Sequence, residues 1–298
     1  MNNFKGTFFV VLSAAIFGFT PILGKITYLQ GSNAIMLTFL RTFLCVPILF
    51  TILKVKKIDL KVTKVQAKEL IILSFIGSAV TTVLLYQSYN YIPVGTATTL
   101  HFVYPLFTAL GAVLIFKEHL SLPKIIALVL ATAGITFFTN DLNGGLIGII
   151  FALVSGLTYA FYILYLDKSS LLDLHPLKLS FYINLIVAVC VFIYGLFTNS
   201  LTLSLTPTAW ILSLAVAVLC GFMGITLFQM RVKLVGSTTS AILSMFEPIT
   251  SVFCGILLLG EPLEWKSLLG SALILAGVTI LTLFKDKAPV ESESSDPA

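Results

Sequence analysis

The sequence predicts an all-helical membrane protein with ten transmembrane helices, arranged as two inverted repeats of five helices. Three observations lead to this prediction: the composition, a series of long apolar stretches and an internal repeat. Of the 298 residues, 58% are hydrophobic and only 10% are charged, whereas a soluble domain carries about 25% charged residues. A chain this apolar cannot cover a water-facing surface, which excludes an ordinary soluble protein.

Each crossing of a bilayer needs about 20 apolar residues, and ten stretches of the chain meet that need. They are residues 6–24, 34–53, 70–89, 94–116, 122–139, 145–166, 176–198, 208–230, 237–259 and 265–284. The first stretch follows Lys5, as the apolar part of a signal peptide would. It is long enough to span a membrane, so we expect a retained helix.

Basic residues predict the orientation. If the N-terminus is cytoplasmic and every stretch crosses, the outer segments hold only Lys25 and Lys266. The inner segments hold Lys5, Lys54, Lys56, Lys57, Lys61, Lys64, Lys68, Lys117, Lys168, Arg231, Lys233, Lys285 and Lys287. Because cytoplasmic loops are enriched in basic residues, we expect an integral, multi-pass protein of the plasma (inner) membrane with both termini cytoplasmic. This placement accounts for the net charge of +5 without a nucleic-acid partner.

The cysteines and the C-terminal tail carry no predicted chemistry. All four cysteines lie inside apolar stretches, where they fit small buried thiols rather than a metal site or a disulfide framework. Residues 288–298 are acidic, polar and contain proline, so we expect a disordered cytoplasmic tail.

An internal repeat relates the two halves of the chain. Residues 100–138 align with residues 243–281 at a constant offset of 143 without a gap, which pairs Pro105 with Pro248, Glu118 with Glu261 and Gly134 with Gly277. Five helices per copy is an odd number, so the second copy must enter the membrane in the opposite orientation. Inverted repeats are a transporter architecture, with the solute site near the midplane between the halves. We expect the repeats to cover residues 1–139 and 140–287.

The repeated segments carry a resemblance to a known family. The residues concerned are Pro105…Lys117-Glu118-His119-Leu120…Gly134-Ile135, the second copy Glu247-Pro248…Gly260-Glu261-Pro262-Leu263…Gly277-Val278, and Tyr86…Pro93-Val94-Gly95-Thr96-Ala97. On these residues the chain resembles the EamA-type ten-helix exporters of the drug/metabolite transporter superfamily, over essentially residues 6–283. One departure is Lys117, where the second copy has Gly260. The resemblance implies export of amino acids, other metabolites or drugs, driven by protons or by the substrate gradient.

Glu247 is the only acidic residue deep in a predicted span, about 15 Å from its start at 1.5 Å per residue. Ionisable groups at such depth are costly and often functional, which makes Glu247 a candidate for proton coupling. The alternative is a protonated carboxyl that only hydrogen-bonds within the bundle, where Pro248 frees the carbonyl of Ser244. Both interpretations stay open.

Two basic side chains also lie inside predicted spans. His101 precedes Pro105 by four residues and could pass protons, because histidine titrates near neutral pH; the alternative is a neutral histidine that donates to a carbonyl. Arg41 could hold a substrate carboxylate or pair with Glu247. The simpler role for Arg41 is to reach the membrane interface or to tie helices together.

A further set of side chains could form an amphipathic pocket for a small solute. Together with His101, the candidate substrate-binding residues are Tyr86, Gln87, Tyr104, Tyr159, Tyr162, Gln229 and Ser244. Gln87 and Gln229 are related by the repeat and could face each other. Tyr89 and Tyr91 are expected at the membrane interface. Close helix packing is expected at the small residues Ala15, Gly18, Gly111, Gly134, Gly255 and Gly277.

These observations favour a secondary transporter that exports a small polar or amphipathic metabolite by alternating access. A channel would show a continuous polar face, and a scaffold has no need for an inverted repeat with paired prolines. The sequence contains no recognisable catalytic motif or phosphate-binding loop, so we expect neither an enzyme nor a cofactor. The expected partners are the lipid bilayer, a small-molecule solute and, as a candidate coupling ion, the proton. The oligomeric state is not predicted.

Overall fold

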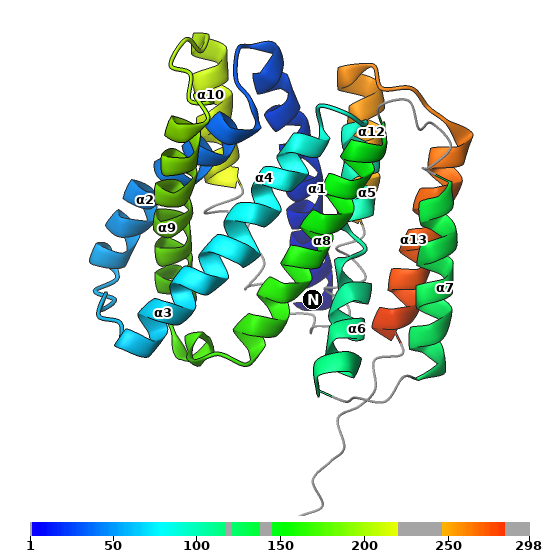
Figure 1. Cartoon of the computed structure of the whole chain (residues 1–298), viewed down its shortest axis with the longest axis horizontal. Helices are drawn as coiled ribbons and strands as arrows, with labels where there is room; N and C mark the ends of the chain where they lie inside the picture. The colour runs from blue at the N-terminus through cyan, green and yellow to red at the C-terminus, as the bar shows by residue number, and fades with distance from the viewer. Residues whose placement is uncertain (1, 117–120, 138–144, 220–245, 284–298) are drawn as a thin grey trace, which may run out of the picture.

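The computed structural model describes residues 2–116, 121–137, 145–219 and 246–283, and the regular elements within these ranges are all helical (Figure 1). The α-helices are α1 (Asn2–Leu29), α2 (Ala34–Val55), α3 (Lys64–Ile72), α4 (Thr81–Ser88), α5 (Val94–His101), α6 (Tyr104–Phe116), α7 (Leu122–Thr136), α8 (Gly145–Asp167), α9 (Pro176–Phe197), α10 (Pro207–Val216), α12 (Phe246–Leu259) and α13 (Trp265–Leu283). A π-helical segment, η1 (Leu73–Val80), joins α3 to α4, and a 3-10 helix, η2 (Ser170–Asp173), precedes α9.

Five helical segments are long and apolar enough to cross a membrane, namely Ala34–Val55, Lys64–Ser88, Val94–Ile115, Gly145–Asp167 and Pro176–Phe197. Five shorter apolar helices, of 10–17 residues, accompany them among the described residues. Large apolar side chains cover the outside of the bundle, with Leu114 78% and Phe197 85% exposed. Such a surface is stable against lipid tails rather than water. The chain is therefore a multi-pass membrane protein. The count of ten spans stays a prediction, because four predicted spans, over residues 122–139, 208–230, 237–259 and 265–284, lie partly outside the described residues.

N-terminal capping residues and prolines define where several helices begin. Asn33 accepts the amide of Met36 at 2.8 Å at the start of α2. Thr63 and Gln66 form a reciprocal capping box at the start of α3. Proline occupies the first turn of α7, α9 and α10, where the missing N–H would have no partner within the helix.

The predicted span over residues 94–116 is two helices rather than one. α5 ends at His101, a turn follows, and α6 begins at Tyr104. Pro105 explains the break, because its ring would clash with the carbonyl four residues earlier, that of His101. That carbonyl lies against Gly156 of α8, where a Cβ atom would come within 2.9 Å of it. The break therefore also fixes where α8 packs.

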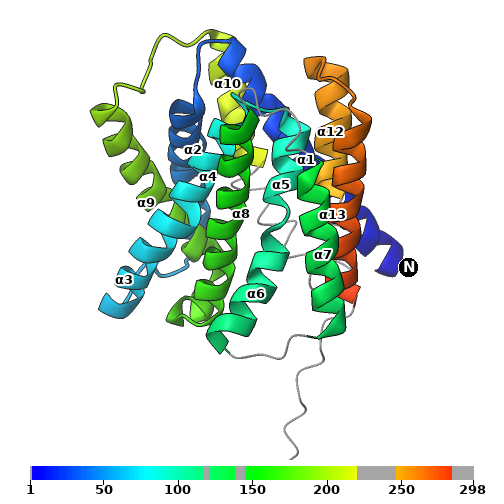
Figure 2. The ribbon, with the colours of Figure 1, turned by 45° about the vertical axis from the view of Figure 1, so that its right-hand side comes forward.

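The two halves of the chain pack on each other in a reciprocal pattern. α7 packs against α13, and α2 against α9, side by side in both views (Figures 1 and 2). α1 packs against α12, and correspondingly α8 packs against α5 and α6. α4 packs on α8 as α10 packs on α1. When the two repeats are exchanged, the α7–α13 and α2–α9 pairs each map onto themselves. The α1–α12 pair maps onto the contact of α8 with α5 and α6, and the α4–α8 pair maps onto the α10–α1 pair.

Glycine contacts show the same reciprocity at the scale of single atoms. A Cβ atom at Gly134 would lie 2.7 Å from the carbonyl oxygen of Gly270, and one at Gly277 would lie 2.7 Å from that of Ala127. The two contacts are equivalent under the 143-residue offset, because Gly134 corresponds to Gly277 and Gly270 corresponds to Ala127. The expected close packing is confirmed at these glycines, at Gly18 against Glu247, and at Gly111 against Leu164. At Gly255 the neighbour is a carboxylate, that of Glu261, rather than a packed apolar side chain.

Candidate functional site

Four of the predicted site residues lie together where α5, α6 and α8 meet. The ring of Tyr104 stands edge-on to that of Tyr159, with centroids 4.8 Å apart, and the ring of His101 lies 5.5 Å from Tyr159. Tyr162 stacks on Tyr159 at 5.6 Å with an interplanar angle of 8°. We call His101, Tyr104, Tyr159 and Tyr162 the aromatic cluster. It combines apolar ring faces with four groups that can form hydrogen bonds.

Hydrogen bonds define the state of the His101 ring. Its Nδ1 lies 2.8 Å from the hydroxyl oxygen of Ser155, and that hydroxyl donates to the carbonyl of Ala152 at 2.6 Å. Because the single hydroxyl proton is used toward Ala152, the serine oxygen accepts from Nδ1–H. A neutral His101 then carries its lone pair on Nε2, which can accept a proton or a hydrogen bond. The hydrogen-bond partner that the described residues give His101 is thus a serine hydroxyl, and donation to a carbonyl stays a prediction.

Tyr86 and Gln87 lie outside the aromatic cluster, on α4. The Tyr86 hydroxyl accepts from the guanidinium of Arg41 at 3.0 Å, and the Tyr28 hydroxyl donates to the Tyr86 carbonyl at 2.9 Å. The Gln87 side chain instead accepts from the Asn90 amide at 3.1 Å, near the end of the helix. The structure therefore divides the predicted substrate-binding set into two groups.

Arg41 ties α2 to α4, as the simpler of its predicted roles requires. Its guanidinium both donates to the Tyr86 hydroxyl and lies 5.7 Å from the centre of the Tyr86 ring. A cation over an aromatic face is attracted by the ring quadrupole. Tyr89 is also buried, at 1% exposure, so its prediction as an interfacial residue is wrong. Tyr91, at 46% exposure, does have the surface position expected for that role.

Of the remaining predicted site residues, the structure describes only Glu247. Gln229 and Ser244 lie outside the described residues. Glu247 belongs to α12, and its backbone carbonyl lies against Gly18 of α1. The neighbouring Ser251 hydroxyl donates to the Gly18 carbonyl at 2.7 Å. By the 143-residue offset Glu247 corresponds to Tyr104, so this acid occupies the position that an aromatic-cluster residue holds in the first repeat.

Glu261 is a partly buried polar residue that sequence reasoning did not select as a site. It lies between α12 and α13, and its Oε1 accepts the backbone amide of Val94 at 2.6 Å. Burial raises the pKa of the Glu261 carboxyl above its usual value, although the amides of Val94 and Gly95 and the charge of Lys25 act in the opposite direction. In the sequence, Glu261 serves only to align the two repeats, as the partner of Glu118, and no role is assigned to it there.

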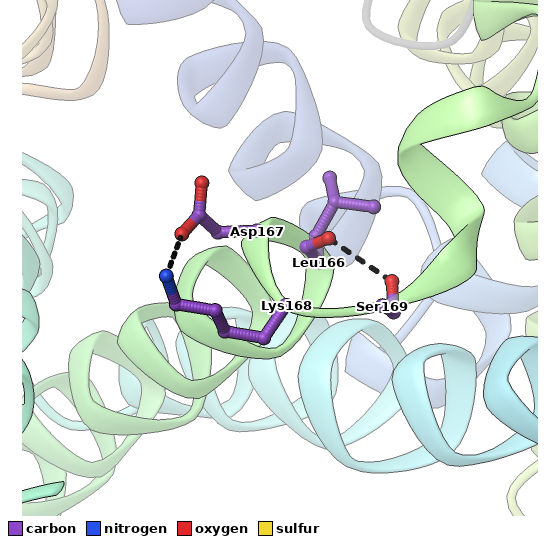
Figure 3. Close-up of polar contacts among 4 residues, drawn as sticks. All are labelled: Leu166, Asp167, Lys168 and Ser169. Carbon is purple, nitrogen blue, oxygen red and sulfur yellow. Dashed lines mark hydrogen bonds and ion pairs between the residues drawn. The ribbon is translucent and has the colours of Figure 1, made fainter. Parts of the chain in front are cut away.

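The polar contacts at the corner after α8 are structural. Figure 3 shows the Lys168 ammonium 3.4 Å from the Asp167 carboxylate, and the Ser169 hydroxyl donating to the Leu166 carbonyl at 3.0 Å. The Asp167 and Lys168 side chains are 62% and 59% exposed, so their ion pair contributes little. Among the described residues, no group of three or more His, Cys, Asp or Glu side chains could hold a metal ion.

Long apolar helices, reciprocal packing of two halves and an internal cluster of polar aromatic side chains define a repeat-built, multi-pass membrane protein. The model of the EamA-like transporter family matches residues 4–140 and, a second time, residues 146–283. The chain therefore belongs to the EamA-like transporter family. This confirms the resemblance drawn from the sequence.

Similar proteins agree with this assignment. The chain is 30% identical over 213 residues to an uncharacterized transporter of Synechocystis sp., covering 68% of this chain and 63% of the relative. It is 27% identical over 179 residues to an uncharacterized transporter of Archaeoglobus fulgidus, covering 60% of this chain and 62% of the relative. Both alignments thus span less than two thirds of the relative. A solved crystal structure of a protein aligns with 94% of this chain and 98% of its own, with a TM-score of 0.67 at 12% identity, which is a likeness of fold.

Proposed function

We propose that the protein is a secondary transporter that moves a small polar or amphipathic metabolite, such as an amino acid, by alternating access between two inverted repeats. The observation that carries this proposal is the reciprocal packing of the repeats, down to the pair of glycine contacts on α7 and α13. If two related halves can adopt different conformations, exchanging those conformations moves the opening from one side of the membrane to the other.

The aromatic cluster is the proposed solute site. It draws on α5, α6 and α8, and therefore on both repeats. Ring faces suit an apolar or aromatic part of the solute, while the His101 Nε2 and the tyrosine hydroxyls suit its polar groups. Tyr86 and Arg41 form a second polar group that could receive a carboxylate. The same proposal keeps Gln87, on α4, and Gln229 and Ser244, from the second repeat, as solute-binding residues.

Coupling and direction form part of the same proposal. Glu247 and His101 are the proposed proton carriers, since both are ionisable groups inside apolar helices. We also propose export from the cytoplasm across the plasma membrane, which the family resemblance supports, with both termini cytoplasmic, which the distribution of lysines supports. The same proposal includes the extents of the two repeats, residues 1–139 and 140–287, and the disordered cytoplasmic tail at residues 288–298.

Solute flux in proteoliposomes tests the proposal directly. We expect saturable flux and counterflow of a radiolabelled amino acid or aromatic metabolite from a panel, because a transporter exchanges solute across its two states. If protons are coupled through Glu247, Glu247→Gln should keep counterflow but lose the dependence of net flux on a pH gradient. Flux that never saturates and shows no counterflow would instead indicate a channel, and no flux of any solute would favour a scaffold.

A further inference from the structure

Glu261 joins the two repeats at one end of the bundle. It lies in the loop between α12 and α13, and its two carboxyl oxygens accept the amides of Val94 at 2.6 Å and Gly95 at 3.4 Å. These are the first amides of α5, and the first amides of any helix lack partners within it. They also form the positive end of the helix dipole, which favours a carboxylate. A side chain of the second repeat thus caps a helix of the first.

The backbone around Glu261 is shaped to receive this side chain. A Cβ atom on Gly255 would collide with the Glu261 carboxylate, so only glycine at position 255 leaves room for that carboxylate. A Cβ atom on Gly95 would lie 2.6 Å from the Cα atom of Val252, so glycine there allows α5 to approach α12. The Glu261 amide donates to the Gly255 carbonyl at 3.2 Å, which holds the loop over the end of α12.

Lys25 extends the connection to two more helices. Its ammonium, on α1, donates to the carbonyl of Tyr89 at the end of α4, and its positive charge attracts the Glu261 carboxylate. The ends of α1, α4, α5 and α12 therefore meet through Glu261 and Lys25. Figures 1 and 2 place the start of α5 and the loop that follows α12 at the same end of the bundle.

The free-energy terms at Glu261 oppose one another. Burial disfavours the charged carboxyl and outweighs the two amides and Lys25, as the direction of its pKa shift indicates. In the closed arrangement the Glu261 carboxyl is therefore protonated more readily than a carboxyl in water.

We propose that Glu261 is a latch that holds the α5 end of the transporter closed, and that its release from Val94 and Gly95 accompanies opening at that end. The proposal rests on alternating access, the proposed function. Glu261 acts here as a positioning residue, because it holds α5 against the α12–α13 loop rather than contacting the solute.

A thiol-labelling experiment tests the latch without any solute. In a protein whose native cysteines are replaced, Thr99→Cys places a thiol on a fully buried position of α5 that contacts Ser271 of α13. We expect Glu261→Ala to label with a membrane-impermeant methanethiosulfonate reagent about fivefold faster, the factor equivalent to one hydrogen bond of about 1 kcal/mol. Glu264→Ala is the matched control, because Glu264 lies in the same loop and is exposed.

The conservative variant separates a latch from a general requirement for folding. Glu261→Gln keeps an acceptor for Val94 and should label no faster than the wild type, which supports the latch. Rates are compared only for protein that elutes as a folded monodisperse species. Equal labelling of Glu261→Ala and Glu264→Ala would overturn the proposal, and so would faster labelling of Glu261→Gln. Failure of every flux assay would overturn the proposed function while leaving these labelling rates interpretable.

Discussion

Individual polar side chains in this protein are positioned by nearby backbone features and by partners that are distant in the sequence. His101 stands at the helix break that Pro105 imposes, and Ser155, from α8, determines which of its ring nitrogens carries the proton. Glu261 is positioned in the same manner, by the absence of a Cβ atom at Gly255. The hydrogen-bond partners of the two side chains, Ser155 for His101 and Val94 for Glu261, come from the other repeat.

The latch should depend on pH in a defined direction. The pKa of Glu261 is raised above its usual value of 4.5 in the closed arrangement, whereas a carboxyl released to water regains that value. Below pH 4.5 the group is neutral in both arrangements, and closure is strongest. As the pH rises through the raised pKa, ionisation favours release, so closure weakens. Lys25 is the charged group that faces Glu261, and its attraction is smaller than the effect of burial.

As the pH rises above 4.5, labelling of Thr99→Cys should therefore accelerate by more than the change in reactivity of the thiol itself explains. Ser204→Cys, an exposed position, provides the correction for thiol reactivity. Glu261→Gln should show only that correction, because an amide does not titrate. An identical excess acceleration in Glu261→Gln would mean that another group sets the pH dependence.

At the scale of helices, small residues determine how closely the two repeats approach. α7 and α13 cross where Gly134 faces Gly270 and Gly277 faces Ala127, with each glycine against a backbone carbonyl. A backbone oxygen cannot rotate away as a side chain can, so even one methyl group must separate the helices.

We expect Gly134→Ala and Gly277→Ala each to lower the stability of the folded protein by about 1–3 kcal/mol, the usual cost of overpacking. The two effects should be similar, because the contacts are related by the repeat. Gly145→Ala is the control, since its Cβ atom would lie 3.7 Å from Ile92, an ordinary contact. Thermal unfolding in detergent measures all three. Destabilisation by only one of the two α7–α13 variants would argue against equivalent packing.

The sequence predicted the helical class, the repeat and the family, because each depends on patterns along the chain. Hydropathy located the long spans, and the Pro105–Pro248 register located the repeat. The sequence could not separate Tyr86 from the aromatic cluster, because apolar periodicity does not indicate which helices pack together. It missed the role of Glu261 for a similar reason: a cap from 167 residues away has no local signature. Tyr89 looked interfacial from its position near a helix end, yet tertiary packing buries it.

At the scale of the whole molecule, basic side chains gather at one end of the bundle. The segment that joins α2 to α3 carries Lys56, Lys57 and Lys61, all exposed, and lies at the opposite end from the start of α10 (Figure 1). Tyr182 donates to the Leu60 carbonyl and Lys178 to the Lys61 carbonyl, so this segment is held against α9. The end where α5, α10 and α13 begin has few basic residues, chiefly Lys25 and Lys266.

This asymmetry predicts the orientation in the membrane. Moving a lysine-rich segment across a bilayer is strongly disfavoured during insertion, so the α2–α3 segment should face the cytoplasm and the α9–α10 segment the outside. In a cysteine-free background, Ser204→Cys should react with an impermeant reagent in right-side-out vesicles, and Lys56→Cys only in inside-out vesicles. Both positions are exposed, so each should react fully after detergent is added, which controls for access. If both positions react from the same side of an intact membrane, the number of crossings between α2 and α10 must be even, and the inverted arrangement of the repeats fails with it.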